Sequence, residues 1–331
     1  MNPITIVIVA HGRADILRST LMGLAACQKP VSFRGTILAE NGPPCGIESV
    51  VAEFQEELCI EHLRISDPRK TVALNAAVEK AETGWAIFID DDVRVPADWI
   101  MHYARAFEQA PAGYYFGGPT RCDYEEIPPD WLLHYLPDSA RGLKFPAGTT
   151  EICFPSFFLG FNWAASVESI KLAHGYPIDF GPGTSYGVAD ESLMQQSLCM
   201  QGMRGRLIPE AIVWHQIPKD RCSPDWCLKR VFQGARFAGM VAAHHDRKQK
   251  RRLAWARSYA RHFRYRLRSI PRLEVFRLNA HGRFWISRMW TSVRGFHVGY
   301  NQPLDQYSFT NNEFPRLNAG LTGLARETIV P

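Results

Sequence analysis

The chain has no long apolar run. Although 46% of its 331 residues are hydrophobic, no stretch of about 18 or more consecutive apolar residues occurs, so we expect no membrane-spanning helix. The first ten residues lack the basic start of a signal peptide, and the short β-branched run within them is typical of a first strand. We therefore expect a cytoplasmic protein, built as one large domain or as one domain with an extension.

A second pair of cysteines at zinc-ligand spacing is also missing. The eight cysteines are scattered, and the closest two, Cys222 and Cys227, have four residues between them and no second pair beside them. This pattern favours reduced thiols in a cytosolic protein over a disulfide framework or a zinc site.

Acidic residues are nearly absent from residues 247–294. This segment holds fifteen Lys or Arg residues and a single acid, Glu274, which gives it a net charge of +14 and leaves −9 for the rest of the chain. An acidic body with a basic C-terminal segment indicates two separate roles.

Strand and helix patterns alternate over the first 120 residues. Apolar β-branched runs predict the strands, and apolar residues at helical spacing predict the helices. The predicted strands are Thr5–Ala10, Thr36–Ala39, Ile60–Ile65, Trp85–Ile89 and Tyr114–Gly117, and the predicted helices are Ala14–Cys27, Ile47–Leu58, Thr71–Ala81 and Pro96–Gln109. This alternation predicts an α/β fold with a mixed, mostly parallel sheet flanked by helices.

The second half of the chain is less regular. Residues 119–183 are rich in Pro, Gly and aromatic residues, which indicates functional loops. Beyond them, Glu191–Gln201 predicts a helix and Arg206–Val213 predicts a strand. The pattern turns helical after Asp225, so we divide the chain into a domain of residues 1–225 and a basic helical extension of residues 226–331.

Three consecutive aspartates follow the fourth predicted strand. Asp90, Asp91 and Asp92 repel one another, and a divalent cation that bridges to phosphate oxygens would neutralise that repulsion. The alternative is a solvated acidic turn before a helix that Pro96 helps to start. Ligands of parallel sheets bind beyond the carboxyl ends of the strands. His11 to Arg13 and Glu40 with Asn41 end two other strands, so we expect one crevice to collect these groups.

Four separated segments together resemble the inverting glycosyltransferases of family 2, which have the GT-A fold and use nucleotide-sugar donors. The segments are Ile6–Arg13, Leu38–Gly42, Ile87–Val93 and Tyr186–Leu193, the last followed by Val213-Trp214-His215. The resemblance covers about residues 4–240 and depends on the order of the segments, because an Asp-x-Asp pair alone is common.

The resemblance implies roles for the acidic cluster. Asp90 corresponds to the residue that contacts the donor ribose, and Asp92 corresponds to the ligand of Mn²⁺ or Mg²⁺ on the diphosphate. Asp91 holds the middle position of the motif, where its role is open. His215 falls where many members place a further metal ligand or diphosphate contact.

The donor pocket is implied in the same way. Glu40 stands where the family more often has an Asp that reads the nucleotide base, so its longer side chain leaves the base open, with a UDP-sugar favoured. Ala10, Arg13 and Lys70 resemble other donor-pocket positions, although Arg13 also fits a solvated charge beside a helix. Trp163 resembles a residue that lines the sugar and acceptor side, and a plain core position explains it equally well.

Asp190 resembles the catalytic base. The family usually has Glu-Asp here, and Ala189 replaces the first acid. Glu191 follows at once, so a shifted register would make Glu191 the base, while Asp190 also fits an N-cap of the following helix. A carboxylate is needed because an acceptor hydroxyl becomes a good nucleophile only when a base removes its proton.

The implied activity is an inverting, divalent-metal-dependent transfer of a hexosyl group from a nucleoside-diphosphate sugar to a saccharide or lipid-linked acceptor, in bacterial surface polysaccharide or glycolipid synthesis. Gln233 to Phe237 partly matches the Gln-x-x-Arg-Trp motif of processive synthases, but Phe replaces Trp, which favours transfer of one sugar. The alternatives are a nucleotidyltransferase and a glycan-binding protein with a relic site.

The basic segment 247–294 has several interpretations. Arginines mixed with aromatic residues fit a helix on an anionic membrane surface or a clamp for an anionic acceptor. A solvated helical face explains the pattern equally well. Nucleic-acid binding has only the charge in its favour, and we do not expect it.

Overall fold

The computed structural model describes residues 2–109, 112–249, 254–268 and 280–301. Contacts divide the chain into two compact units. Unit 1 comprises residues 1–125, 138–185 and 190–217, and unit 2 comprises residues 126–137, 186–189 and 218–331. The predicted division at residue 225 stays a prediction, although it did not anticipate that two short inner segments join unit 2.

An eight-stranded sheet forms the centre of unit 1, with strand order β3-β2-β1-β4-β9-β6-β10-β8. Its strands are β1 (Ile4–Ala10), β2 (Phe33–Asn41), β3 (Ile60–Ile65), β4 (Trp85–Asp90), β6 (Tyr114–Gly117), β8 (Glu151–Ile152), β9 (Trp163–Ser166) and β10 (Arg204–Leu207). The first four pair in parallel, and β9 runs antiparallel between β4 and β6. A second, three-stranded sheet joins β5 (Val93–Arg94), β11 (Val213–Ile217) and β7 (Thr120–Tyr124).

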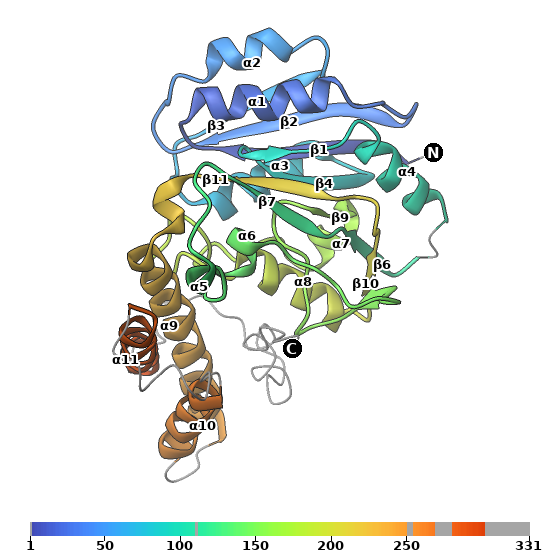
Figure 1. The fold of residues 1–331 in the computed structure, drawn as a ribbon. Coiled ribbons are helices and arrows are strands. Elements are labelled where there is room, and N and C mark those ends of the chain that lie inside the picture. Colours follow the sequence, from blue (N-terminus) through green and yellow to red (C-terminus); the bar gives the residue numbers. More distant parts are fainter. Residues whose placement is uncertain (1, 110–111, 250–253, 269–279, 302–331) are drawn as a thin grey trace. The chain divides into compact units, whose positions relative to one another are not determined.

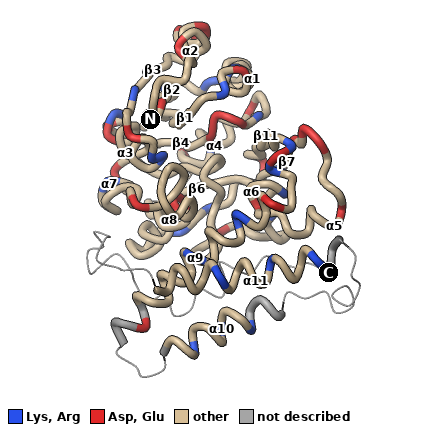
Figure 2. The backbone as a smooth tube through the Cα atoms, turned by 90° about the vertical axis from the view of Figure 1, so that its left-hand side faces the viewer, with Lys and Arg blue, Asp and Glu red and all other residues tan. Residues whose placement is uncertain are grey.

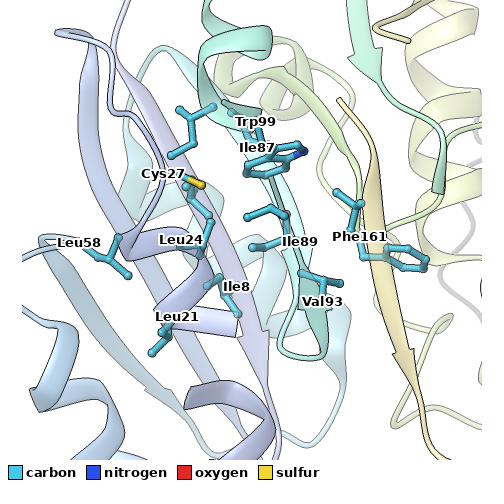
Figure 3. Packing of buried hydrophobic residues seen from close by; sticks show 14 of the residues in the cluster. Ile8, Leu21, Leu24, Cys27, Leu58, Ile87, Ile89, Val93, Trp99 and Phe161 are labelled. Carbon is cyan, nitrogen blue, oxygen red and sulfur yellow. The ribbon is translucent and has the colours of Figure 1, made fainter. Parts of the chain in front are cut away.

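Helices cover both faces of the large sheet. These are α1 (Ala14–Ala25), α2 (Glu48–Phe54), α3 (Lys70–Ala81), α4 (Trp99–Gln109), α7 (Val167–Leu172) and α8 (Asp190–Met200). Alternate residues of β1 point to opposite faces, as the period of a strand requires. Ile6 and Ile8 pack with α1, α2 and α4, whereas Val7 and Val9 pack with α3, α7 and α8. Figure 3 shows the first cluster, and Figure 1 shows α1 and α2 on one side of the strands.

The predicted fold class is confirmed, and the predicted strands Ile60–Ile65 and Tyr114–Gly117 have the observed bounds. The single strand predicted for Arg206–Val213 is wrong. Only its ends are strand: Arg206 and Leu207 belong to β10 and Val213 belongs to β11, and these strands lie in different sheets. Between them Ala211 donates to the carbonyl of Ile208 in a turn around Pro209, whose missing N–H cannot continue a ladder.

The region predicted as loops, residues 119–183, also contains short elements. They are β7, β8, β9, α5 (Asp130–Leu133), α6 (Asp138–Arg141) and α7. Strand β9 is only four residues long and is defined by pairing with β4 and β6, which lie far from it in sequence. Such pairing leaves no local pattern for a sequence-based prediction.

Unit 2 is mostly helical, with the 3₁₀ turn η1 (Lys219–Cys222) before α9 (Pro224–Gln249), α10 (Ala254–Arg268) and α11 (Ala280–Tyr300). Helices α9 and α11 approach so closely that a Cβ on Gly299 would lie 1.8 Å from the carbonyl oxygen of Arg236. Tyr135 joins this core, where its ring contacts the ring of Phe284 and lies under the guanidinium of Arg288. Within the described ranges, no helix is long and apolar enough to cross a membrane.

Candidate active site

Strand pairing gathers the first part of the site at the carboxyl ends of β1, β2 and β4. Ala10 at the end of β1 is paired with Glu40 of β2, and the neighbouring Val9 is paired with Asp90 of β4. The two acidic residues therefore flank the end of β1. The predicted crevice positions lie together because three parallel strands end at one edge.

Arg13 holds two of the three aspartates. Its Nη2 lies 2.5 Å from Oδ1 of Asp91, and its Nη1 lies 2.9 Å from Oδ2 of Asp92. Both aspartates are buried, whereas Asp90 is partly exposed. Burial, together with the charge of Asp92, raises the pKa of Asp91 to about 6, and the Arg13 guanidinium opposes this shift. The charge of Arg13 thus compensates these two carboxylates. This pairing favours the donor-pocket interpretation of Arg13 over that of a solvated charge beside a helix.

Thr20 of α1 holds the backbone of the turn after β4. The backbone N–H of Val93 donates to Oγ1 of Thr20 at 3.1 Å, and this hydroxyl lies 2.8 Å from the carbonyl oxygen of Asp91. Thr20 is buried, so these bonds are shielded from water. The aspartate side chains consequently project from a rigid turn.

His215 of β11 reaches the same cluster because β11 pairs with β5 directly after the aspartates. Its Nε2 lies 3.1 Å from Oδ1 of Asp92, and its Nδ1 lies 2.6 Å from the carbonyl oxygen of Ser139. The carbonyl can only accept, so Nδ1 carries the proton. Burial lowers the pKa of His215, but the charge of Asp92 and the bonds to Asp92 and Ser139 outweigh it, so the pKa is raised.

The pair Asp92 and His215 fits a hard divalent cation. Neutral His215 directs the lone pair of Nε2 at a carboxylate oxygen, and two acceptors 3.1 Å apart repel unless a proton or cation lies between them. Neighbouring ligands of an octahedral ion at about 2.1 Å are separated by roughly 3 Å, which matches this distance. The carbonyl that fixes the tautomer is the usual outer partner of a metal-binding histidine.

The protein alone supplies few ligands. Among the described residues, no group of three or more His, Cys, Asp and Glu side chains is arranged to hold a metal ion. Oδ2 of Asp91 is buried and has no hydrogen-bond partner in the described part of the chain. A cation here would therefore take its remaining ligands from a bound diphosphate or water, as Mg²⁺ commonly does.

Lys70 connects Asp90 with the second part of the site. The Lys70 ammonium forms an ion pair with Asp90. Burial lowers the pKa of Lys70, but the charges of Asp90, Asp190 and Glu191 outweigh it and raise the pKa. Lys70 begins α3, and its backbone N–H donates to the carbonyl of Pro182 at 3.0 Å. One cation therefore lies near the carboxyl groups of two separate elements of unit 1, the end of β4 and the start of α8.

Asp190 is buried at the first position of α8, against Gly181. Gly181 has a φ of +85°, and a Cβ there would lie 2.8 Å from Cβ of Asp190. The Gly181 loop is tied to α3, because Oγ1 of Thr71 donates to the carbonyl of Phe180 at 3.3 Å beside the bond from Lys70. Asp190 is thus fixed by a helix start on one side and by a glycine on the other.

Glu191 is a different kind of carboxyl group. Burial and the neighbouring Asp190 raise its pKa well above the ordinary value, so it retains a proton more readily. Its side chain lies over Gly160, where a Cβ would come within 3.5 Å. A protonated Glu191 is suited to donate a hydrogen bond to Asp190 and to help hold that side chain in place.

Glu40 is buried and fixed by three neighbours. Its Oε1 accepts from the backbone N–H of Cys45 at 2.8 Å and from Sγ of Cys45 at 3.1 Å, and its Oε2 lies 3.0 Å from Nε2 of His62. Burial raises the pKa of Glu40, but the Cys45 bonds and the charges of His62 and Arg64 outweigh it and lower the pKa. Glu40 is therefore held as a carboxylate.

Two predicted site residues are fully buried. Trp163 is fully buried on β9, where its ring stacks on Phe88 with centroids 4.9 Å apart. Ala10 is also fully buried. Of the two interpretations of Trp163, its position favours the core, because the side chain has no exposed surface to offer a sugar.

Sequence reasoning missed several neighbours of the site. Ser139, Gly181 and Cys45 orient predicted residues, and no local pattern marks them. His62 and Arg64 could have been predicted from the sequence, because they are two residues apart on β3 and so share one face of that strand. In unit 2, the Gln-x-x-Arg segment lies on α9, where Arg236 stacks over the ring of Tyr186 at 4.8 Å.

Comparisons with known proteins agree with this architecture. Residues 5–166 match the model of the family described as Glycosyl transferase family 2. No sequence of a curated protein matches the chain significantly. The mannosyltransferase PcManGT from Pyrobaculum calidifontis, solved with GDP-Man and Mn²⁺, has a TM-score of 0.55 and 19% identity over 90% of this chain and 87% of that chain.

Two further solved structures share the fold. TarS 1-349 of S. aureus has a TM-score of 0.53 and 12% identity over 89% of this chain and 81% of that one. GalNAc-T7, solved with UDP, GalNAc and Mn²⁺, has a TM-score of 0.54 and 12% identity over 89% of this chain but only 56% of that chain. The protein thus shares the GT-A fold of these structures, and residues 5–166, just under half of the chain, match the glycosyltransferase family 2 model.

Proposed function

We propose that the protein is an inverting, divalent-metal-dependent glycosyltransferase that moves one hexosyl group from a nucleoside-diphosphate sugar to a hydroxyl acceptor. The observation that carries this proposal is the position of Lys70, which pairs with Asp90 and is within electrostatic reach of Asp190. Residues suited to the donor and a carboxylate suited to activate an acceptor are therefore neighbours in one unit.

The donor half of the site contains a base reader, a ribose contact and two cations. Glu40 is held as a carboxylate beside the end of β1 and would accept from an N–H of the base. Asp90 would contact the ribose, and Arg13 and Lys70 would offer positive charge to the diphosphate. A UDP-sugar is the favoured donor, while the similar solved structures contain GDP-Man in PcManGT and UDP-GlcNAc in TarS.

Asp92 and His215 would hold Mn²⁺ or Mg²⁺. The chemistry that such an ion supplies when bound is stabilisation of the negative charge on the departing diphosphate. Ser139 keeps His215 in the tautomer whose proton is on Nδ1, which leaves the lone pair of Nε2 to a cation, and Arg13 compensates the charge of Asp92.

Asp190 would act as the base. It would take the proton of the acceptor hydroxyl as its oxygen bonds to the anomeric carbon and the bond from that carbon to the diphosphate oxygen breaks. Attack from the side opposite the diphosphate inverts the anomeric centre. Proton removal of this kind contributes about 10²–10⁴-fold to the rate.

The acceptor that we propose is a saccharide or a lipid-linked saccharide of bacterial surface polysaccharide or glycolipid assembly. The proposal of this acceptor class is supported by the resemblance of the four sequence segments to the family 2 glycosyltransferases. The replacement of Trp by Phe237 supports single transfer over processive synthesis.

Asp190→Asn tests the proposal. Nucleoside diphosphates with Mn²⁺ are first screened by thermal shift, because a ligand that binds the native state raises the melting temperature. The sugar conjugates of the best diphosphate are then assayed for transfer and hydrolysis. We expect Asp190→Asn to lose nearly all transfer and to keep the thermal shift. Full activity of Asp190→Asn, or turnover that EDTA leaves unchanged, would contradict the base or the metal, respectively.

A further inference from the structure

Helices α10 and α11 carry charge of one sign. Helix α10 contains five arginines and α11 contains three, and neither helix contains Asp or Glu. Arg257, Arg261 and Arg264 are exposed and follow one another at helical spacing, so they share one face of α10. Figure 2 shows blue and no red along the described parts of both helices. This face repels cations and attracts an anionic partner.

The same two helices expose large apolar side chains. Of the eleven exposed large hydrophobic side chains in the described part of the chain, five belong to α10 and α11: Trp255, Phe263, Ile286, Trp290 and Val298. Trp290 is 64% exposed, and Ile286 lies one helical turn before it on the same face. Arg294 follows one turn later and is also exposed. Apolar and basic side chains therefore share one exposed stripe of α11.

An open apolar cavity lies between the two helices. It has a volume of about 270 Å³ and is lined by Tyr259, Ala260, His262, Phe263, Val293 and Phe296. The polar atoms nearby are used within the protein, because Nε2 of His262 lies 3.0 Å from Oγ of Ser292 and the hydroxyl of Tyr259 lies 2.8 Å from Nδ1 of His297. The surface that this cavity offers to a ligand therefore consists of aromatic rings and aliphatic carbon atoms, and we call it the slot.

We propose that this α10–α11 face, defined by Arg257, Arg261, Arg264, Trp290 and Phe263, docks onto an anionic phospholipid bilayer. Arginines bind lipid phosphates, exposed tryptophans settle at the headgroup level, and the slot takes a segment of an acyl chain. This proposal is independent of the transfer chemistry.

Other partners fit the same face less well. A nucleic acid would match the arginines and stack on the aromatic rings, but it offers nothing apolar to Ile286, Val298 or the slot. A second copy of the same face would bring arginines against arginines. The bilayer matches both the charge and the apolar surface.

Vesicle sedimentation of the full chain tests the proposal. Vesicles of phosphatidylcholine with about one third phosphatidylglycerol are compared with pure phosphatidylcholine at low and high salt. Each arginine near an anionic surface strengthens binding by about fivefold, so R257Q/R261Q is expected to weaken it by roughly 25-fold. The matched control R34Q/R105Q removes two exposed arginines of unit 1 and is expected to bind as the wild type does.

The apolar contribution has its own pair of variants. Trp290→Ala is expected to weaken vesicle binding by about tenfold, whereas Leu172→Ala, which removes an exposed leucine of α7, leaves it unchanged. Melting temperatures and donor hydrolysis verify that each variant is folded. Equal binding to neutral and anionic vesicles, or equal loss in the two arginine pairs, overturns the proposal. Binding of oligonucleotides in place of vesicles, or a dimer that Trp290→Ala dissociates, would assign the face to those partners and also overturn it.

Discussion

Substitution of Gly181 by alanine would displace the proposed base without changing its chemistry. The new Cβ would lie 2.8 Å from Cβ and 2.9 Å from Cγ of Asp190, whereas ordinary contact begins at about 3.4 Å. The loop cannot yield freely, because Thr71 and Lys70 tie its neighbours Phe180 and Pro182 to α3. Asp190 therefore has to move by about half an ångström or more.

The expected loss follows from this displacement. A misplacement of about 1 Å in a catalytic group costs on the order of 10²-fold, so we expect kcat to fall by about 10- to 100-fold. Alanine at a φ of +85° also destabilises the fold by about 1–2 kcal/mol. Gly202 has the same φ of +85° with no atom within 4 Å of its Cβ position, so Gly202→Ala carries the backbone cost alone.

Transfer kinetics of Gly181→Ala and Gly202→Ala, together with urea unfolding and donor affinity, separate the two effects. We expect Gly202→Ala to lose only the backbone contribution to stability and Gly181→Ala to lose at least as much, because of its contact with Asp190. Both variants should bind donor normally, while only Gly181→Ala loses kcat. If the two variants retain the same kcat, the position of Asp190 does not limit the reaction, and the assignment of the base is wrong.

Three other predictions concern the metal, the second carboxyl group and the helix pair. Asp92→Asn is expected to abolish most of the thermal shift that Mn²⁺ adds to a nucleoside diphosphate, while Asp123→Asn, which also removes an aspartate paired with an arginine, keeps it; equal shifts would exclude Asp92 as a ligand. The folded-state pKa of Glu191 is raised above its ordinary value of 4.5, so folding binds its proton and stability falls as pH rises above about 4.5. Glu191→Gln should therefore be more stable than the wild type at pH 8 and flatten unfolding free energy against pH, and an unchanged slope would contradict this. Gly299→Ala is expected to destabilise the protein by about 1–3 kcal/mol through contact with Arg236, whereas Gly234→Ala, at an open position of α9, gains about 0.5–1 kcal/mol; similar melting temperatures would refute the close helix contact.

The sequence predicted those parts of the site that follow a local pattern. The run before Asp90 marked a buried strand, and the alternation of strands and helices placed its end beside the ends of β1 and β2. The position of His215 against Asp92 has no such pattern, because β11 reaches β5 through pairing between distant segments. The strand predicted for Arg206–Val213 failed for a related reason, since its two ends pair with distant strands of different sheets and a turn around Pro209 separates them.

Burial also decided between interpretations that composition left open. Arg13 could have been a solvated charge, but it pairs with two buried aspartates. Trp163 could have lined the sugar side, but it packs in the core on Phe88. Exposed and buried versions of these residues have the same sequence context, so only their tertiary neighbours distinguish them.

The sequence by itself determined that the chain forms a mostly parallel α/β sheet and that carboxylates collect at its strand ends, because strand and helix periods and the order of the segments are local properties. Only the tertiary structure determined how those carboxylates are held: Arg13 and His215 on Asp92, Lys70 between Asp90 and Asp190, and Gly181 against Asp190. These contacts join residues that lie far apart along the chain, and their energies depend on burial and distance, which no local pattern contains.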